Sequence, residues 1–113
     1  MKKSNIIFKI DLDEKNIPDN IAWEASDTGN NPMPTKAIAC SVWDDKKQNT
    51  LRIDLWTKEM RVDEMDRFFV DTLGGLSQTI LNATGDKFLS GELVNLCERF
   101  VEYLEKKNYG QPS

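Results

Sequence analysis

The spacing of apolar residues changes once along the chain, and this change limits the possible folds more than any other feature. Up to about residue 57, apolar and polar residues alternate in short runs, as they do in strands with one buried face. From residue 63 onward, apolar residues recur at spacings of three and four, as they do in amphipathic helices. A run of strands followed by a run of helices predicts an α+β fold.

Four strands are predicted in the first half, at about residues 5–12, 20–25, 36–43 and 50–57. The run at 36–43 is short and rich in alanine, so a helix remains an alternative for it. Between the second and third strands, residues 26–35 are rich in glycine, asparagine and proline, which predicts an exposed loop.

The third and fourth strands have one favoured register as a hairpin. If Val42 pairs with Leu51, all the aliphatic residues of both strands fall on one face, and this agreement supports the strand interpretation of 36–43. The opposite face then carries four residues that are candidates for a partner-binding surface: Trp43, Arg52, Asp54 and Trp56. Burial of the two tryptophans under loops is the structural alternative.

Two helices are predicted at about residues 63–84 and 87–107, with Gly85 ending the first and Asp86 capping the second. The pair Gly74-Gly75 in the middle of the first helix suggests a close helix contact or a bend. We expect a single domain over residues 1–113, in which a four-stranded antiparallel sheet is followed by an amphipathic helical hairpin packed on one face.

Composition excludes several classes of function. The 113 residues contain no histidine, which removes the commonest general base and the commonest nitrogen ligand for metals. A net charge of -4 without a basic stripe opposes nucleic-acid binding. Cys40 and Cys97 have apolar neighbours and are expected to be buried thiols. The carboxylates of Asp11, Asp13 and Glu14 are expected to be a solvated strand end, so we predict no metal, no cofactor and no enzymatic activity.

No apolar run approaches the roughly 20 residues that a membrane-spanning helix needs. The opening residues lead into an alternating pattern rather than into the apolar block of a signal peptide. The sequence therefore predicts a cytoplasmic protein without membrane insertion.

The stretch at residues 49–60, the acidic residues that follow at 62–65, and the pair Phe68-Phe69 together resemble the gliding motility protein GldC family. Further likeness appears in the first strand and at residues 21–25, 36–38, 43–44 and 83–86, whereas the loop at 26–35 departs from the family's pattern. The resemblance implies an accessory role in the surface gliding of bacteria that crawl without flagella, and it implies no catalytic residue.

Two functional hypotheses follow from these observations. The first is a cytoplasmic accessory or adaptor protein of gliding motility that binds a protein partner of the gliding or secretion machinery and forms a homo-oligomer. The second is a small holdase-like chaperone of the SecB kind, because an acidic protein with this order of strands and helices could present apolar grooves to unfolded clients. Suppression of client aggregation separates the two.

Overall fold

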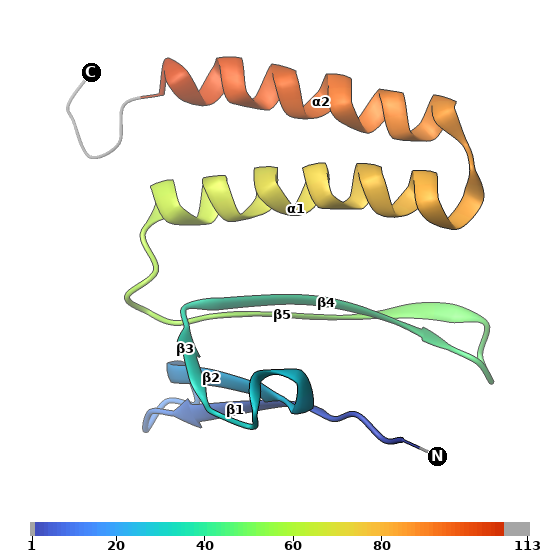
Figure 1. The fold of residues 1–113 in the computed structure, drawn as a ribbon. Helices are drawn as coiled ribbons and strands as arrows, with labels where there is room; N and C mark the ends of the chain where they lie inside the picture. The colour runs from blue at the N-terminus through green and yellow to red at the C-terminus, as the bar shows by residue number, and fades with distance from the viewer. Residues whose placement is uncertain (1, 108–113) are drawn as a thin grey trace. The chain divides into compact units, whose positions relative to one another are not determined.

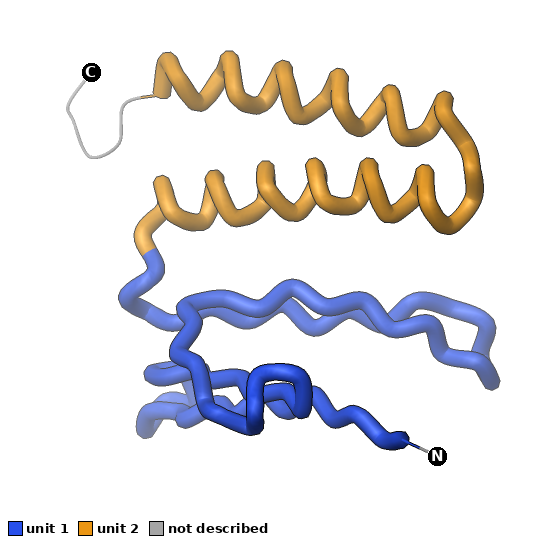
Figure 2. The backbone as a smooth tube through the Cα atoms, in the orientation of Figure 1, with its two compact units in different colours: residues 1–60 blue, residues 61–113 orange. Residues whose placement is uncertain are grey.

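The computed structural model describes residues 2–107 and contains five β-strands, one short 3-10 helix and two long α-helices. Figure 1 shows their order along the chain. The chain divides into two compact units, residues 1–60 with all the strands and residues 61–113 with both helices (Figure 2). The α+β class is thereby confirmed. The single domain and the packing of the helices on the sheet stay predictions.

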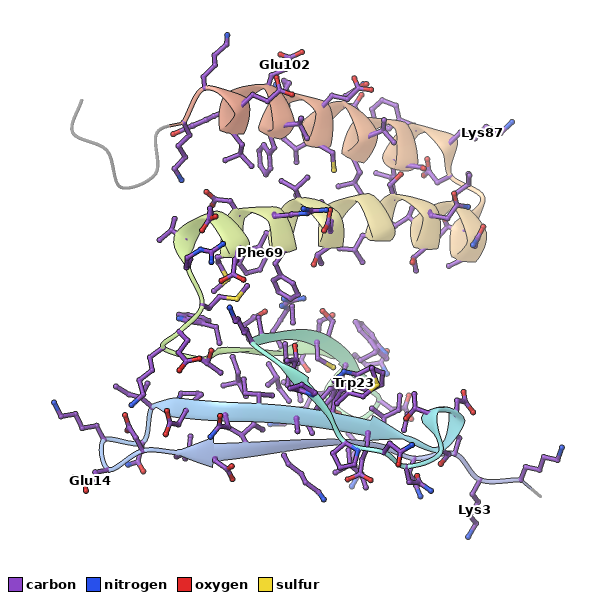
Figure 3. All side chains as sticks on the ribbon, turned by 60° about the vertical axis from the view of Figure 1, so that its left-hand side comes forward. Lys3, Glu14, Trp23, Phe69, Lys87 and Glu102 are labelled. Atoms are coloured by element: carbon purple, nitrogen blue, oxygen red, sulfur yellow. The ribbon has the colours of Figure 1, made fainter. Side chains whose placement is uncertain are left out.

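The first sheet contains three antiparallel strands in the order β1-β2-β3. β1 spans Ile6–Leu12 and β2 spans Pro18–Ala25, close to the predicted bounds. Ile21 and Ala25 are buried, and they lie on one face of β2 together with the partly buried Trp23, as the alternation predicts. Figure 3 shows the indole of Trp23 at this sheet.

The third strand of this sheet, β3, spans Met33–Thr35 within the segment that was predicted to be a loop. It pairs with Ile21 to Trp23 of β2, and a short 3-10 helix, η1, at Ser26–Thr28 precedes it. Pro34 is tolerated because β3 is an edge strand, where a missing backbone N–H can face outward. The prediction of an irregular loop over 26–35 is therefore wrong at its C-terminal end.

A separate two-stranded sheet contains β4 at Ala37–Asp44 and β5 at Asn49–Trp56. Val42 pairs with Leu51, so the predicted register is confirmed and the helical alternative for 36–43 is wrong. The prediction of one four-stranded sheet is also wrong, because the strands divide into sheets of three and two. The physical reason is that β3 pairs with the second edge of β2, so this edge is not open to the β4–β5 hairpin.

The two sheets of the first unit are linked where β5 ends. The backbone N–H of Thr57 donates to the carbonyl of Lys36 at 2.8 Å, and the N–H of Lys58 reaches the carbonyl of Pro18 at 3.4 Å. The Lys58 ammonium lies 3.0 Å from a carboxylate oxygen of Asp13 and 3.6 Å from one of Asp19. The Thr57 bond continues the β4–β5 pairing, whereas the Lys58 contacts join the end of β5 to the β1–β2 turn and to the start of β2.

The second unit is a helical hairpin of α1 at Val62–Thr84 and α2 at Lys87–Glu105. The predicted signals between the helices are confirmed: Gly85 ends α1 with a φ of 72°, and the Asp86 carboxylate accepts from the N–H of Leu89 at 3.0 Å. A left-handed φ of this kind favours glycine.

A pair of small polar residues connects the two helices. The hydroxyl of Ser77 donates to the carbonyl of Ser90 at 3.1 Å, and the hydroxyl of Ser90 donates to the carbonyl of Ser77 at 2.9 Å. Both serines are buried. In contrast, a Cβ added at Gly74 or Gly75 would meet nothing within 4 Å, so the prediction of a close helix contact at these glycines is wrong.

Candidate partner-binding surface

The four residues singled out in the sequence share one face of the β4–β5 hairpin. In the observed register Trp56 lies opposite Ala37, Asp54 opposite Ala39, Arg52 opposite Ser41 and Trp43 opposite Thr50. Side chains alternate between the faces of a strand, so these pairs all lie on the same side. We call this side, defined by Trp43, Arg52, Asp54 and Trp56, the tryptophan face.

The centre of the tryptophan face is a connected polar group. The Arg52 guanidinium contacts both carboxylate oxygens of Asp54, with Nη2 to Oδ1 at 2.5 Å and Nε to Oδ2 at 3.3 Å. Its Nη1 donates to the Ser41 hydroxyl on the neighbouring strand. A two-point contact holds the guanidinium plane in one orientation. Because the pair is partly exposed, we expect it to contribute only about 0–1 kcal/mol to stability.

The two tryptophans lie at opposite ends of this face. Trp43 is 59% exposed and Trp56 is 51% exposed, and their cross-strand neighbours, Thr50 and Ala37, are small. Six positions of β-strand separate the two sites, which corresponds to roughly 20 Å. The surface therefore has two separate indole anchors with a polar centre between them, rather than one continuous aromatic patch.

The opposite face of the hairpin is only partly buried. Ile38 is buried at 7% exposure, and Leu55 and Cys40 are half-buried. Towards the hairpin turn the aliphatic residues become exposed: Val42, Leu51 and Ile53. Sequence reasoning missed this apolar patch, because alternation identifies the face on which a residue lies and not how much of that face is covered.

The carboxylates near the end of β1 serve a turn. One Asp13 oxygen accepts from the N–H groups of Lys15 at 2.8 Å and Ile17 at 3.0 Å, and the other contacts the Lys58 ammonium. The Ile17 hydrogen bond and the Lys58 contact lower the pKa of Asp13, and the same contact raises the pKa of Lys58. Asp11 and Glu14 are exposed as expected for a solvated strand end, whereas Asp13 is partly buried and paired with Lys58. Within residues 2–107 no group of three potential ligands is placed to hold a metal ion.

The helical hairpin carries shallow apolar depressions between its helices. One is lined by Phe69, Phe100 and Tyr103, with the ion pair of Lys107 and Asp66 at 2.7 Å beside it. The hydrogen bond to Asp66 raises the pKa of Lys107. Cys97 is half-buried with a free thiol, as is Cys40 in β4, so both cysteines are less buried than predicted.

None of the helices in the described part of the chain is long and apolar enough to span a membrane.

Comparison with known proteins identifies one family. Residues 18–106 match the family model described as gliding motility-associated protein GldC-like. This match covers the β4–β5 hairpin and both helices. Among curated proteins and among solved structures, no match to the chain was found.

Proposed function

The chain belongs to the GldC-like family of gliding motility-associated proteins, and we propose that it acts in this process as an accessory or adaptor protein that holds a protein partner on its tryptophan face. In this proposal the protein works in the cytoplasm and acts by binding rather than by catalysis. The family membership supports the process, and the hairpin supports the mode of action.

The observation that carries the proposal is the half-exposure of two tryptophans on either side of an ordered polar centre. Tryptophan is enriched among the residues that dominate binding energy, because a large rigid ring buries much apolar area at a small entropic cost. An exposed indole without a partner costs free energy in water, so two of them on one small hairpin favour an interface.

The polar centre supports recognition of a partner with its own polar groups. Arg52 and Asp54 hold each other in place, so their remaining hydrogen-bonding positions point in defined directions before binding. A partner gains from this arrangement because less side-chain entropy is lost on association. We therefore expect a partner segment with apolar side chains at two points about 20 Å apart and polar groups between them.

Co-purification from gliding cells tests the proposal. Tagged wild-type protein is expected to recover a component of the motility or secretion machinery, identified by mass spectrometry. The double variant Trp43→Ala, Trp56→Ala is expected to lose it. The matched control is Tyr103→Ala, which removes an aromatic residue of α2 that is 59% exposed, as Trp43 is.

Three results would contradict the proposal: recovery of only unrelated abundant proteins, equal recovery by the wild type and the double variant, or equal loss with Tyr103→Ala. Far-ultraviolet circular dichroism of each variant separates lost binding from lost folding. Cell fractionation tests the proposed location, since the protein should appear with cytoplasmic markers.

A further inference from the structure

β1 forms one edge of the three-stranded sheet; its pairing with β2 is regular from Ile6 to Asp11 and shifts register between Asp11 and Leu12. Within residues 2–107 no strand pairs with β1 other than β2. The strand is seven residues long and contains no proline, and its apolar side chains are exposed to 67% at Ile6, 43% at Phe8 and 54% at Leu12. β3 at the other edge has only three residues and contains Pro34. An open, apolar edge of this length is a template for a further strand.

The register with β2 determines which backbone groups of β1 point outward. The N–H of Ser26 donates to the carbonyl of Asn5 at 3.0 Å, so the pair of Asn5 and Ser26 is hydrogen-bonded. Hydrogen-bonded residues alternate along an antiparallel strand. Ile7, Lys9 and Asp11 therefore direct their backbone groups towards β2, whereas Ile6, Phe8 and Ile10 direct theirs towards the open edge.

The side chains of β1 complement a second, antiparallel copy of the same strand. With a two-fold axis at Ile10, Lys9 of each copy lies opposite Asp11 of the other, and Phe8 lies opposite Leu12. The two charged pairs then occupy non-hydrogen-bonded positions, where Cα atoms are only about 4.5 Å apart and side chains interact most. A two-fold axis at Lys9 would instead place two lysines opposite each other, which is unfavourable.

The charged residues are available for this pairing. Asp11 is exposed, and within residues 2–107 its side chain makes no hydrogen bond or ion pair. Lys9 contacts Glu24 of β2 at 2.9 Å, yet its side chain remains 64% exposed and can accept a second carboxylate. Figure 3 shows β1 running along the sheet between the labelled Lys3 and the turn at Glu14.

We propose that β1 pairs with β1 of a second copy of this chain about a two-fold axis at Ile10, which joins two three-stranded sheets into one of six strands. The pairing joins residues 8–12 of the two copies, and the second copy is favoured over a foreign strand because opposite charges and apolar residues complement each other within this stretch. The new surface is separate from the tryptophan face, since β1 belongs to the other sheet of the unit.

Charge reversal with mixing tests this dimer. Sedimentation equilibrium should find the wild-type chain as a dimer. Asp11→Lys places two lysine pairs across the axis and Lys9→Glu places two acidic pairs there, so each variant alone should raise the dimer dissociation constant at least about tenfold. Mixed in equal amounts, the two variants should form a heterodimer of wild-type affinity. In that heterodimer the retained Lys9 of one copy meets the retained Asp11 of the other, and the two introduced residues, which have opposite charges, meet each other.

Two matched controls accompany these variants. Asp45→Lys makes the same change in charge as Asp11→Lys in the exposed turn between β4 and β5, and it should leave the dimer unchanged. Glu24→Gln removes the contact with Lys9 inside one chain and should also leave the dimer unchanged. The proposal is overturned by a wild type that is monomeric at every concentration, by a dimer insensitive to Asp11→Lys, by failure of the mixture to restore dimers, or by equal weakening with either control. Circular dichroism confirms that each variant is folded.

Discussion

Two isoleucines on the same face of the β4–β5 hairpin should differ sharply when each is replaced by alanine. Ile38 is 7% exposed and its cross-strand partner Leu55 is half-buried, whereas Ile53 is 52% exposed. Replacing a buried isoleucine removes its transfer free energy and leaves a cavity, which together cost about 2–5 kcal/mol. We expect about 3 kcal/mol for Ile38→Ala.

Only about half of the Ile53 side chain is removed from water in the folded state, and its replacement by alanine leaves no enclosed cavity. We therefore expect Ile53→Ala to cost about 1 kcal/mol. The preference of isoleucine over alanine for strands applies to both sites and largely cancels in the comparison. The two free energies of unfolding should therefore differ by about 2 kcal/mol. Urea titration followed by tryptophan fluorescence at one fixed protein concentration measures this difference, provided that the denaturant slope stays constant.

Equal costs would refute the reasoning. If both substitutions cost about 3 kcal/mol, Ile53 is covered in solution, as it would be if the helical hairpin packs on this face in the way the sequence predicts. If both cost about 1 kcal/mol or less, Ile38 does not belong to a packed core.

Three further predictions address the helices, the turn after β1 and the mode of action. Gly75→Ala should stabilise the protein by up to about 1 kcal/mol in thermal unfolding, because a Cβ there meets open space in a helix interior. Gly85→Ala should destabilise it by about 1 kcal/mol, because Gly85 has a left-handed φ of 72°. Effects of the same sign would contradict the backbone conformations assigned to the two glycines. The pKa of Asp13 is lowered in the folded state, so its charge stabilises the fold above the ordinary carboxyl pKa of about 3.9, and this contribution disappears as the pH falls through the lower folded pKa. Asp13→Asn should therefore melt below wild type at neutral pH, and the difference should shrink as the pH falls below the ordinary carboxyl pKa. A difference that stays constant with pH would show that the charge is not responsible. Exhaustive chelation should leave the melting temperature of the protein unchanged, and a large decrease would contradict the prediction that no metal is needed for folding. A stoichiometric excess of the protein should fail to suppress the aggregation of an unfolded client, whereas suppression would favour the holdase hypothesis.

The sequence by itself determined the features that depend on neighbouring residues in the chain. The change of apolar period located both helices and the four longer strands within a few residues, because side-chain direction follows directly from backbone period. The register of the β4–β5 hairpin was predictable since a shift by one residue would have moved every aliphatic side chain to the other face. Gly85 and Asp86 marked the helix turn through their own backbone conformation and hydrogen bonding.

Only the tertiary structure decided which segments pair and how much of each face is covered. Alternation could not show that Met33–Thr35 would occupy the free edge of β2, because edge pairing is a competition between distant segments for the same backbone hydrogen bonds. Alternation placed Arg52 and Asp54 on one face, but only the structure shows that they contact each other and that Ser77 and Ser90 pair between the helices. The open edge of β1 was also decided by the tertiary structure, because a strand is an edge strand only when one of its two sides has no pairing partner.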